Sequence, residues 1–343
     1  MQRCLIVGPS WVGDMIMAQG LYRALRDRFP ELRIDVLAPA WSGPILNRMA
    51  EVNRVVVSPY GHGQFDLSGR RAQARSLRVE DYDWAIVLPN SWKSALLPLL
   101  ARIPRRTGYV GEFSYGLLND ARQLDKTGLP RLVDRYRALA DAPPAGPADY
   151  PKLTVDPAKQ VASLTRLGLS LDRPVLALCP GAEYGPAKRW PEAHYAEVAK
   201  AKLDQGWQVW LFGSASDRAV CDTINTLSGG TGRNLAGETA LEEVVDLLAC
   251  AGAVVTNDSG LMHVAAAVGV PVVAVYGSTD PGYTPPLSAR ARVVRLGLEC
   301  SPCFKRECPL VHLDCLRRLD AGRVQAELDD LLSQATGVEA CSS

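Results

Sequence analysis

Short apolar runs alternate with amphipathic segments of helical length along almost the whole chain. Runs rich in Val, Ile and Leu predict strands near residues 4–7, 34–37, 54–57, 84–88, 107–110, 175–179, 209–212, 253–256, 272–276 and 293–296. Helical periodicity between these runs predicts helices near 15–28, 42–50, 92–102, 131–140, 191–203, 217–227, 241–250 and 259–268. Strands separated by helices predict mostly parallel sheets that are covered by helices on both faces.

The alternation stops once, in the proline-rich segment from Asp141 to Pro151, which has no periodicity and is typical of a linker. A chain of 343 residues also exceeds the size at which single cores usually divide. We therefore predict an α/β protein with two Rossmann-like, doubly wound domains, residues 1–150 and 151–343, that face each other across a cleft. A last helix near 321–335 is expected to pack back on the first domain.

Composition narrows the class of protein. With 47% hydrophobic residues, 22% charged residues and a net charge of +1, the chain is typical of a globular enzyme and lacks the bulk charge that attracts nucleic acid. No apolar run approaches the ~18 residues of a membrane span, and the first residues lack the features of a signal peptide. Nine cysteines, an odd number, favour reduced thiols. We predict a cytoplasmic protein.

The most informative segment is a strand–turn–helix–strand unit in the second half. An apolar strand ends at Asn257, an Ala-rich helix ends at Gly269, and Pro271 opens the next strand. Ligands of parallel α/β sheets bind at the carboxyl ends of the strands. The turn after Asn257 is therefore a candidate binding site.

That turn carries groups that suit an anion or a sugar. Free N–H groups at a helix N-terminus attract anions, while a carboxylate or a hydroxyl can hydrogen-bond a sugar. The candidates are Asp258, Ser259, Gly260 and Leu261. His263, one turn into the helix, could reach the same ligand, but a lone helical histidine is more often simply packed or exposed.

The first strand–helix turn of the chain reads Gly8-Pro-Ser-Trp-Val-Gly13-Asp14. Its length resembles that of a phosphate-binding loop, but Asp14 stands where such a loop carries a lysine. A carboxylate repels phosphate, yet it can accept a proton from a hydroxyl, and a helix N-terminus keeps it ionised. Asp14 is therefore a candidate catalytic base, with a plain first-turn aspartate as the alternative.

Two further strand ends in the second half carry candidates. Lys188 and Arg189 follow the strand at 175–179 in a loop where Gly181 lets the backbone approach a ligand, so this loop could neutralise a diphosphate; a solvated surface loop is the alternative. Asp217 follows the strand at 209–212, where an acidic residue can bind ribose hydroxyls or cap a helix. Both interpretations of Asp217 stay open.

Cysteines and basic residues form two other groups. Four thiolates in tetrahedral geometry could hold a structural zinc ion, but the spacing of the second pair is unusual, and reduced thiols are the favoured interpretation; these residues are Cys300, Cys303, Cys308 and Cys315. Basic residues that would suit an anionic acceptor gather in the first half at Lys93, Arg105 and Arg106, with further arginines in a long loop over 70–78. Most such charges are merely solvated.

Three motifs taken together resemble the ADP-heptose glycosyltransferases of glycosyltransferase family 9. They are Val7-Gly-Pro-Ser-Trp-Val-Gly-Asp14-Met15, Pro180-Gly-Ala-Glu-Tyr-Gly-Pro-Ala-Lys188-Arg-Trp-Pro191 and Asn257-Asp-Ser-Gly-Leu-Met-His263. The segment Cys300-Ser-Pro-Cys-Phe-Lys-Arg-Glu-Cys308-Pro-Leu is more similar to members that add the second heptose of the lipopolysaccharide inner core than to those that add the first. The resemblance covers nearly the whole chain.

This resemblance implies a GT-B architecture and inverting transfer that uses no metal or other cofactor. Asp14 matches the family's catalytic base, Lys188 its diphosphate-binding lysine and Asp217 its ribose contact. Further donor contacts are expected at Gly181, Ala182, Glu183, Asp258, Ser259, Gly260, Leu261 and His263. Acceptor contacts are expected at Gly13, Lys93, Arg105 and Arg106.

The implied reaction moves L-glycero-D-manno-heptose from ADP-heptose to the first heptose of the inner core, on heptosyl-Kdo2-lipid A. Because this acceptor is a lipid, peripheral contact with the inner face of the inner membrane is expected. The alternatives are an enzyme that adds the first heptose, another ADP-sugar transferase, and a two-lobed sugar-binding protein, which would need export. A nucleotide-sugar epimerase is disfavoured because the sequence has no Gly-x-Gly-x-x-Gly fingerprint.

Overall fold

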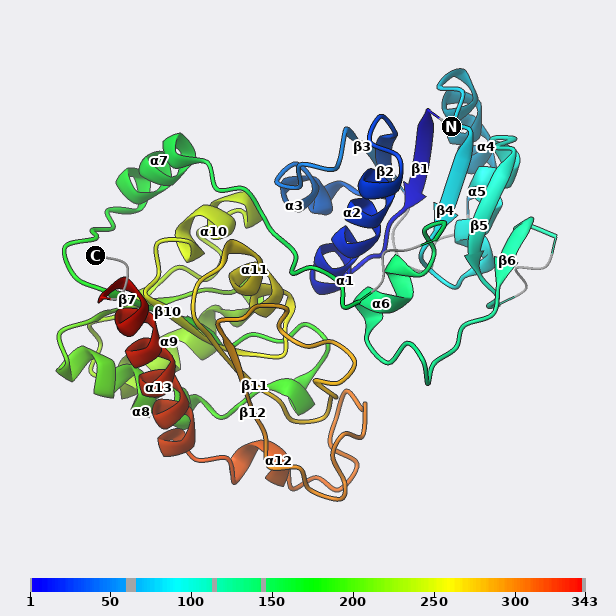
Figure 1. Ribbon diagram of the computed structural model, residues 1–343. Coiled ribbons are helices and arrows are strands. Elements are labelled where there is room, and N and C mark those ends of the chain that lie inside the picture. Colours follow the sequence, from blue (N-terminus) through cyan, green and yellow to red (C-terminus); the bar gives the residue numbers. More distant parts are fainter. Residues whose placement is uncertain (1, 60–65, 113–115, 143–145, 341–343) are drawn as a thin grey trace. The chain divides into compact units, whose positions relative to one another are not determined.

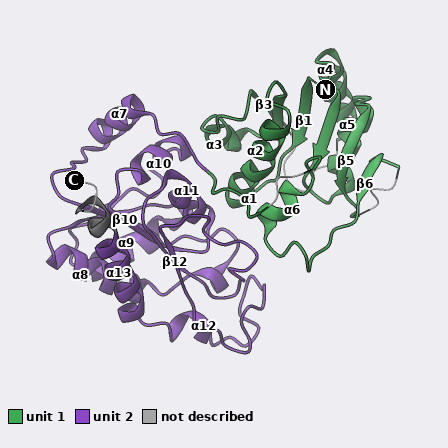
Figure 2. Ribbon diagram, viewed as in Figure 1, with its two compact units in different colours: residues 1–151 green, residues 152–343 purple. Residues whose placement is uncertain are grey.

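The computed structural model describes residues 2–59, 66–112, 116–142 and 146–340. The chain forms two compact units, Met1–Pro151 and Lys152–Ser343, which Figure 2 shows in different colours. Each unit has its own parallel sheet with helices packed on it (Figure 1). No helix among the described residues is both long and apolar enough to cross a membrane.

The first unit contains a six-stranded sheet in the order β3-β2-β1-β4-β5-β6, and every neighbouring pair is parallel. Its strands are β1 (Arg3–Val7), β2 (Arg33–Pro39), β3 (Arg54–Ser58), β4 (Trp84–Val87), β5 (Arg105–Tyr109) and β6 (Asp120–Arg122). Its helices are α1 (Val12–Met17), α2 (Gln19–Arg28), η1 (Ala40–Ser42), α3 (Gly43–Leu46), α4 (Leu67–Val79), α5 (Trp92–Leu100) and α6 (Leu132–Arg137).

The second unit contains a parallel sheet in the order β12-β11-β10-β7-β8-β9. Its strands are β7 (Val175–Cys179), β8 (Gln208–Leu211), β9 (Arg233–Asn234), β10 (Ala253–Asn257), β11 (Val272–Val275) and β12 (Ala291–Val294). Its helices are α7 (Pro157–Leu167), η2 (Pro186–Lys188), α8 (Glu192–Asp204), η3 (Ala215–Asp217), α9 (Arg218–Leu227), α10 (Leu241–Leu248), α11 (Gly260–Val268), α12 (Asp314–Arg317) and α13 (Ala321–Ala340).

The two sheets have the same winding. In each, the first and fourth strands along the unit lie side by side, and the strand order reverses between them, at β1/β4 and at β7/β10. This arrangement confirms the predicted fold class of two Rossmann-like, doubly wound units. Such a reversal opens a crevice at the carboxyl ends of the strands, where ligands of this class bind.

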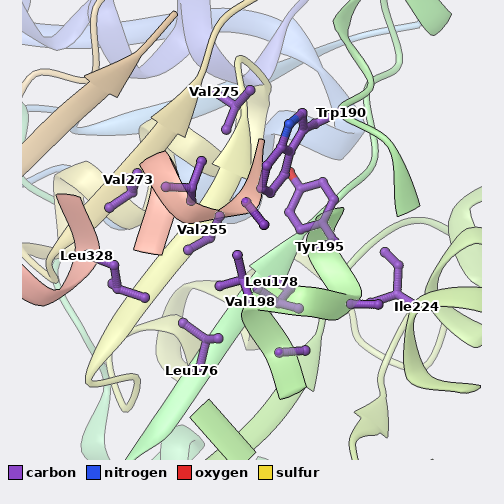
Figure 3. Packing of buried hydrophobic residues seen from close by; sticks show 14 of the residues in the cluster. Leu176, Leu178, Trp190, Tyr195, Val198, Ile224, Val255, Val273, Val275 and Leu328 are labelled. Carbon is purple, nitrogen blue, oxygen red and sulfur yellow. The ribbon is translucent and has the colours of Figure 1, made fainter. Parts of the chain in front are cut away.

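The core of the second unit explains why its sheet forms. Its strands β7, β10 and β11 are buried on both faces, so they are continuous β-branched and Leu runs rather than alternating ones. Figure 3 shows Leu176, Leu178 and Val255 packed with residues from neighbouring helices. Apolar burial of this kind contributes about 25 cal/mol per Å2.

The last helix, α13, packs within the second unit. Its residues Val324, Leu328 and Leu331 are buried in the same core as β11, and the helix contacts α8, β11 and β12. Its expected packing on the first domain stays a prediction, since the structure shows only its packing within the second unit. The buried face of α13 packs on the sheet of its own unit, in the same apolar core as Val273 and Val275 of β11.

The short helix α12 and two long helices, α4 and α7, lie where the sequence pattern predicted none. Helix α4 occupies the segment that the sequence pattern predicts to be an arginine-rich loop. Its buried stripe consists only of Ala74, Leu77 and the largely buried side chain of Arg70, so the apolar period of the helix is not visible in the sequence. Helix α7 begins with an Asp156 cap and Pro157 and ends at Gly168 in the left-handed region, signals that the sequence already contained.

We predict that Leu328→Ala lowers the free energy of unfolding by about 2–5 kcal/mol, because it leaves a cavity between α13 and the sheet. Urea denaturation followed by circular dichroism measures this change. The control is Leu227→Ala at the end of α9, where the side chain is 55% exposed and the expected change is within about 0.5 kcal/mol. Equal effects of the two substitutions would contradict the placement of α13 in the core.

Candidate active site

The candidate donor residues of the second unit follow the carboxyl ends of β7, β8 and β10. Because these neighbouring strands are parallel, their carboxyl ends lie at one edge of the sheet. Three loops meet there: 180–190 after β7, 212–217 after β8 and 258–260 after β10. The β7 and β10 loops flank the point where the strand order reverses, the usual position of a ligand in this fold.

Asn257, at the end of β10, holds the β7 loop in place. Its buried side-chain amide donates a hydrogen bond to the carbonyl of Pro180 at 2.6 Å. Its side-chain oxygen accepts hydrogen bonds from the backbone N–H of Trp190 at 3.1 Å and from the hydroxyl of Tyr195 at 3.0 Å. Both ends of the 180–190 loop are thereby fixed to the strand that carries Asp258.

Lys188 and Asp258 form a largely buried ion pair at this edge. The Lys188 Nζ lies 2.6 Å from Asp258 Oδ2, and the two side chains are only 14% and 5% exposed. Thr279, which follows β11, donates its hydroxyl to the same carboxylate oxygen at 2.5 Å. The ammonium group and the hydroxyl thus donate to the same carboxylate oxygen. Because an ammonium has three donors, Lys188 can also donate to a phosphate oxygen.

Helix α11 begins beside this ion pair and offers its first N–H groups. Ser259 is the extended N-cap residue, and its hydroxyl makes no capping hydrogen bond. The N–H groups of the first turn, starting at Gly260 and Leu261, have no acceptor within the helix. The positive end of the helix dipole adds to their attraction for an anion.

His263 lies in the first turn of α11 and is buried. The pKa of its imidazole is lowered to about 4, mainly by burial; the carboxylate of Asp258 opposes this shift, and the positive charge of Lys188 adds to it. His263 is therefore neutral at physiological pH. It can take part in this site as a hydrogen-bonding group but not as a cation.

Asp217 caps the segment that follows β8. Its Oδ2 accepts hydrogen bonds from the backbone N–H of Ser214 at 2.9 Å and from the Ser214 hydroxyl at 2.7 Å. Its Oδ1 faces Arg189, whose guanidinium lies 3.8 Å away. The Asp217 carboxyl group also lies close to the backbone at Gly181, where a Cβ would be only 2.6 Å from the carboxyl carbon and would clash with it. The capping role of Asp217 is thus observed, and the structure brings the residue to the β7 loop.

Three other donor candidates differ in exposure. Ala182 is buried, so only its backbone could contact a ligand, whereas the Glu183 side chain is exposed. Leu261 is partly buried in the first turn of α11. Of the predicted donor residues, Lys188 and Asp258 are therefore the two whose charged groups the structure joins directly.

Asp14 lies in the first unit, at the carboxyl end of β1. It is the third residue of α1, which begins after the extended N-cap residue Trp11, and its side chain is partly buried. The neighbouring Gly13 is buried in the same turn. A carboxylate in the first turn of a helix is stabilised in its ionised form by the helix dipole, the state that a general base requires.

The basic residues expected at an acceptor site divide into two groups. Lys93 lies in the first turn of α5, at the carboxyl edge of the first sheet, and its carbonyl accepts a hydrogen bond from Arg70. Arg105 and Arg106 lie at the start of β5, hence at the opposite, amino edge of the parallel sheet from Asp14.

The contacts of these two arginines are structural. Arg105 binds Asp120 at 2.6 Å and Asp141 at 2.5 Å. Arg106 donates to the carbonyls of Ile103 and Leu117. The two arginines thus lie at the other edge of the sheet from Asp14, and their role as acceptor contacts stays a prediction.

The four clustered cysteines are free thiols and are partly exposed. The pKa of the Cys315 thiol is raised to about 11, mainly by burial and then by the nearby Cys300, Cys308 and Cys303. In the described part of the chain, no group of three or more His, Cys, Asp or Glu side chains is arranged to hold a metal ion.

Sequence reasoning missed Thr279 and the structural role of Asn257. Thr279 follows the predicted strand 272–276, so the rule that ligand groups follow strand ends could have identified it. The side-chain hydrogen bonds of Asn257 reach residues 62–77 positions away in the chain, and no local sequence pattern predicts contacts over such separations.

Two doubly wound α/β units are the architecture of the GT-B class of glycosyltransferases. The comparisons agree with this class. The chain belongs to glycosyltransferase family 9 (heptosyltransferase), whose family model matches residues 70–313. It is therefore a glycosyltransferase.

Individual relatives are similar over nearly the whole chain. Lipopolysaccharide heptosyltransferase 2 of Escherichia coli is 49% identical over 97% of this chain and 99% of its own length. Lipooligosaccharide heptosyltransferase 2 of Haemophilus influenzae is 50% identical over 85% of this chain and 88% of its own. The solved structure of E. coli ADP-heptose lipopolysaccharide heptosyltransferase II matches with a TM-score of 0.86 and 47% identity, covering 97% and 99% of the two chains.

We predict that His263 makes stability depend on pH in the acid range. Because its pKa falls from the ordinary 6.5 to about 4 on folding, the unfolded chain binds a proton between these values that the folded chain does not. Its contribution to stability is present above pH 6.5 and is lost as the pH falls towards 4, by at most about 1.4 kcal/mol per pH unit.

Urea denaturation at pH 7, 6 and 5 measures this slope in the wild type and in His263→Asn, which should show a shallower decline. The matched control is His312→Asn, at a histidine whose side chain is 37% exposed. If the His263 variant keeps the full wild-type slope, the imidazole is not buried in its neutral form.

Proposed function

We propose that this glycosyltransferase moves heptose from ADP-heptose to the first heptose of the lipopolysaccharide inner core, with inversion at the anomeric carbon. The observation that carries the proposal is the Lys188–Asp258–Thr279 cluster at the strand-order reversal of the second unit. It is supported by 49% identity over 97% of the chain to heptosyltransferase 2, against 31% to a heptosyltransferase 1. Family membership also favours a transferase over an epimerase or a sugar-binding protein.

In this proposal the second unit binds the donor. Lys188, Thr279 and the first N–H groups of α11 hold the diphosphate, and Asp217 contacts the ribose through the oxygen that faces Arg189. As the bond between the anomeric carbon and the diphosphate oxygen breaks, negative charge grows on the leaving ADP. A positioned ammonium and backbone donors stabilise that charge more strongly than bulk water does.

The first unit, in the same proposal, binds the acceptor near Gly13 and Lys93. The Asp14 carboxylate takes the proton from an acceptor heptose hydroxyl while the oxygen attacks the anomeric carbon from the face opposite ADP. One C–O bond forms as the other breaks, the bonding electron pair leaves with ADP, and the proton ends on Asp14. A single displacement of this kind inverts the anomeric centre.

The acceptor lipid would also bring the protein to a membrane surface. We infer that the enzyme acts at the cytoplasmic face of the inner membrane through peripheral contact, since the described residues contain no helix that could cross it. Co-sedimentation with vesicles that contain the lipid acceptor tests this inference. The control vesicles lack both the acceptor and anionic lipid. If the same amount of protein sediments with them as with the acceptor-containing vesicles, binding is not directed by the acceptor.

The reaction itself is tested by incubating purified protein with ADP-heptose and heptosyl-Kdo2-lipid A. The expected result is release of ADP and a product one heptose heavier, whose anomeric configuration is opposite to that of the donor by NMR. Kdo2-lipid A is the control acceptor. Preference for that control would instead assign the chain to the enzymes that add the first heptose.

We predict that Asp14→Asn lowers kcat by about 10²–10⁴-fold, because the amide cannot accept the acceptor proton. Binding of ADP, measured by calorimetry, should stay within about twofold of the wild type, since the substitution changes only the acceptor side of the reaction. The control is Asp27→Asn, at an exposed residue of α2. Retention of most activity in the Asp14 variant would remove this residue from the mechanism.

Lys188→Ala should weaken ADP binding at least about tenfold and lower kcat as well, because the leaving diphosphate loses its cation. The substitution also leaves the carboxylate of Asp258 buried without its partner, so unfolding by urea is measured in parallel to confirm a folded variant. Lys200→Ala on the exposed face of α8 is the control. Unchanged kinetics in the Lys188 variant would exclude its role at the leaving group.

A further inference from the structure

A second segment, far along the chain, contacts the loop that carries Lys188. We call residues 300–308 the cysteine loop. Its Arg306 carbonyl accepts a hydrogen bond from the backbone N–H of Ala187 at 3.0 Å. Gly185, with a φ of +152°, permits this approach, because a Cβ there would lie 2.5 Å from the same carbonyl oxygen.

The cysteine loop is also fixed to the end of β11. The backbone N–H of Phe304 donates to the carbonyl of Ser278 at 2.7 Å, and the hydroxyl of Ser301 donates to the carbonyl of Gly277 at 2.5 Å. Ser278 is the neighbour of Thr279, which binds the Asp258 carboxylate. The loop is therefore joined by hydrogen bonds to two sides of the candidate donor site.

Tyr184 links the charges of the two segments. Its hydroxyl donates to the carbonyl of Phe304 at 2.8 Å. The Lys188 Nζ lies 5.0 Å from the centre of its ring, and the Arg306 guanidinium carbon lies 5.3 Å from the same centre. Such contacts of a cation with an aromatic face are attractive. Both cations thus lie within 5.3 Å of the centre of one ring, on the segment that joins the Lys188 loop to the cysteine loop.

The balance of charge around the site shows why a second cation matters. The ammonium of Lys188 is already paired with Asp258, and Arg189 faces Asp217. A sugar diphosphate brings two negative charges, which this paired lysine alone does not neutralise. Arg306 is exposed, and within the described part of the chain its guanidinium has no acidic partner.

We propose that Arg306 is a second cation of the diphosphate site and binds the donor together with Lys188. This inference rests on the proposed function, because it takes the donor to be a nucleoside diphosphate sugar. Tyr184 holds the two cations on one ring, and the backbone hydrogen bonds of the cysteine loop set the position of the guanidinium. The exposed planar guanidinium suits the bidentate recognition of phosphate oxygens.

Arg306→Ala tests the charge without disturbing the loop, because the carbonyl that binds Ala187 belongs to the backbone and remains. ADP and AMP affinities are measured by calorimetry for the wild type, Arg306→Ala and Arg306→Lys. The matched control is Lys305→Ala, which removes the neighbouring exposed cation of the same loop. The KM for ADP-heptose is measured in the transfer reaction with the same four proteins.

We expect Arg306→Ala to weaken ADP binding about tenfold, or about 1.4 kcal/mol, and AMP binding by much less, since AMP lacks the second phosphate. Arg306→Lys should recover part of the loss, Lys305→Ala should bind ADP as the wild type does, and the KM for ADP-heptose should rise in parallel with the ADP dissociation constant. A loss of affinity for ADP that is larger than the loss for AMP is a change that a merely structural role of the side chain would not produce.

Two results would overturn the inference: wild-type ADP affinity in Arg306→Ala, or equal losses of ADP and AMP, which would indicate a damaged loop. A wild-type protein that binds no ADP overturns it too, together with the proposed function. The wild type could also bind ADP with the expected dependence on Arg306 but transfer no heptose to the acceptor. That result would contradict the proposed function and still support Arg306 as part of a diphosphate-binding site.

Discussion

The ion pair between Lys188 and Asp258 is the interaction on which the candidate donor site depends. Its atoms lie 2.6 Å apart in a position that water scarcely reaches, so each charge needs the other to offset the loss of its hydration. The hydroxyl of Thr279 completes the set of partners around the carboxylate. Three loops from three strands are thereby joined through charged and polar groups rather than through apolar packing.

This pair can form only because of the topology of the sheet. The strands β7 and β10 are far apart in the chain but lie side by side where the strand order reverses, and Asn257 joins their ends by three hydrogen bonds. The first unit repeats the same winding. Asp14 follows β1 there, as Lys188 follows β7 in the second unit. Equivalent first loops thus carry a carboxylate in one unit and a cation in the other, which is the division of labour that a displacement reaction needs.

The sequence predicted every described strand except the short β6 and β9, because buried parallel strands are continuous apolar runs that need no partner to be recognised. The sequence did not predict helix α4, because an arginine occupies part of its buried face and interrupts the apolar periodicity. A cluster of basic residues does not by itself indicate at which end of a strand it stands, and the structure places Arg105 and Arg106 at the start of β5. Their acidic and carbonyl partners lie up to 36 residues away, so the contacts themselves could not be predicted locally.

The same distinction applies to the candidate site. The strand-end rule located Asp14, Lys188, Asp217 and Asp258, because a parallel sheet gathers such positions at one edge whatever the loops contain. It could not locate Arg306, which lies in an irregular segment beyond the edge strand β12; this segment is joined to Tyr184 through Phe304, 120 residues further along the chain.

That segment has little regular structure of its own, so its shape depends on what it contacts. Gly277 lets the chain after it approach closely, since a Cβ there would lie 2.6 Å from Leu316 Cγ, and Ser301 binds the carbonyl of the same glycine. The cysteine loop is thus held by contacts to the end of β11 at Gly277 and Ser278, while its Arg306 carbonyl binds the loop of Lys188. Arg306 and Lys188 are thus connected both through the backbone hydrogen bond of Ala187 and through the ring of Tyr184.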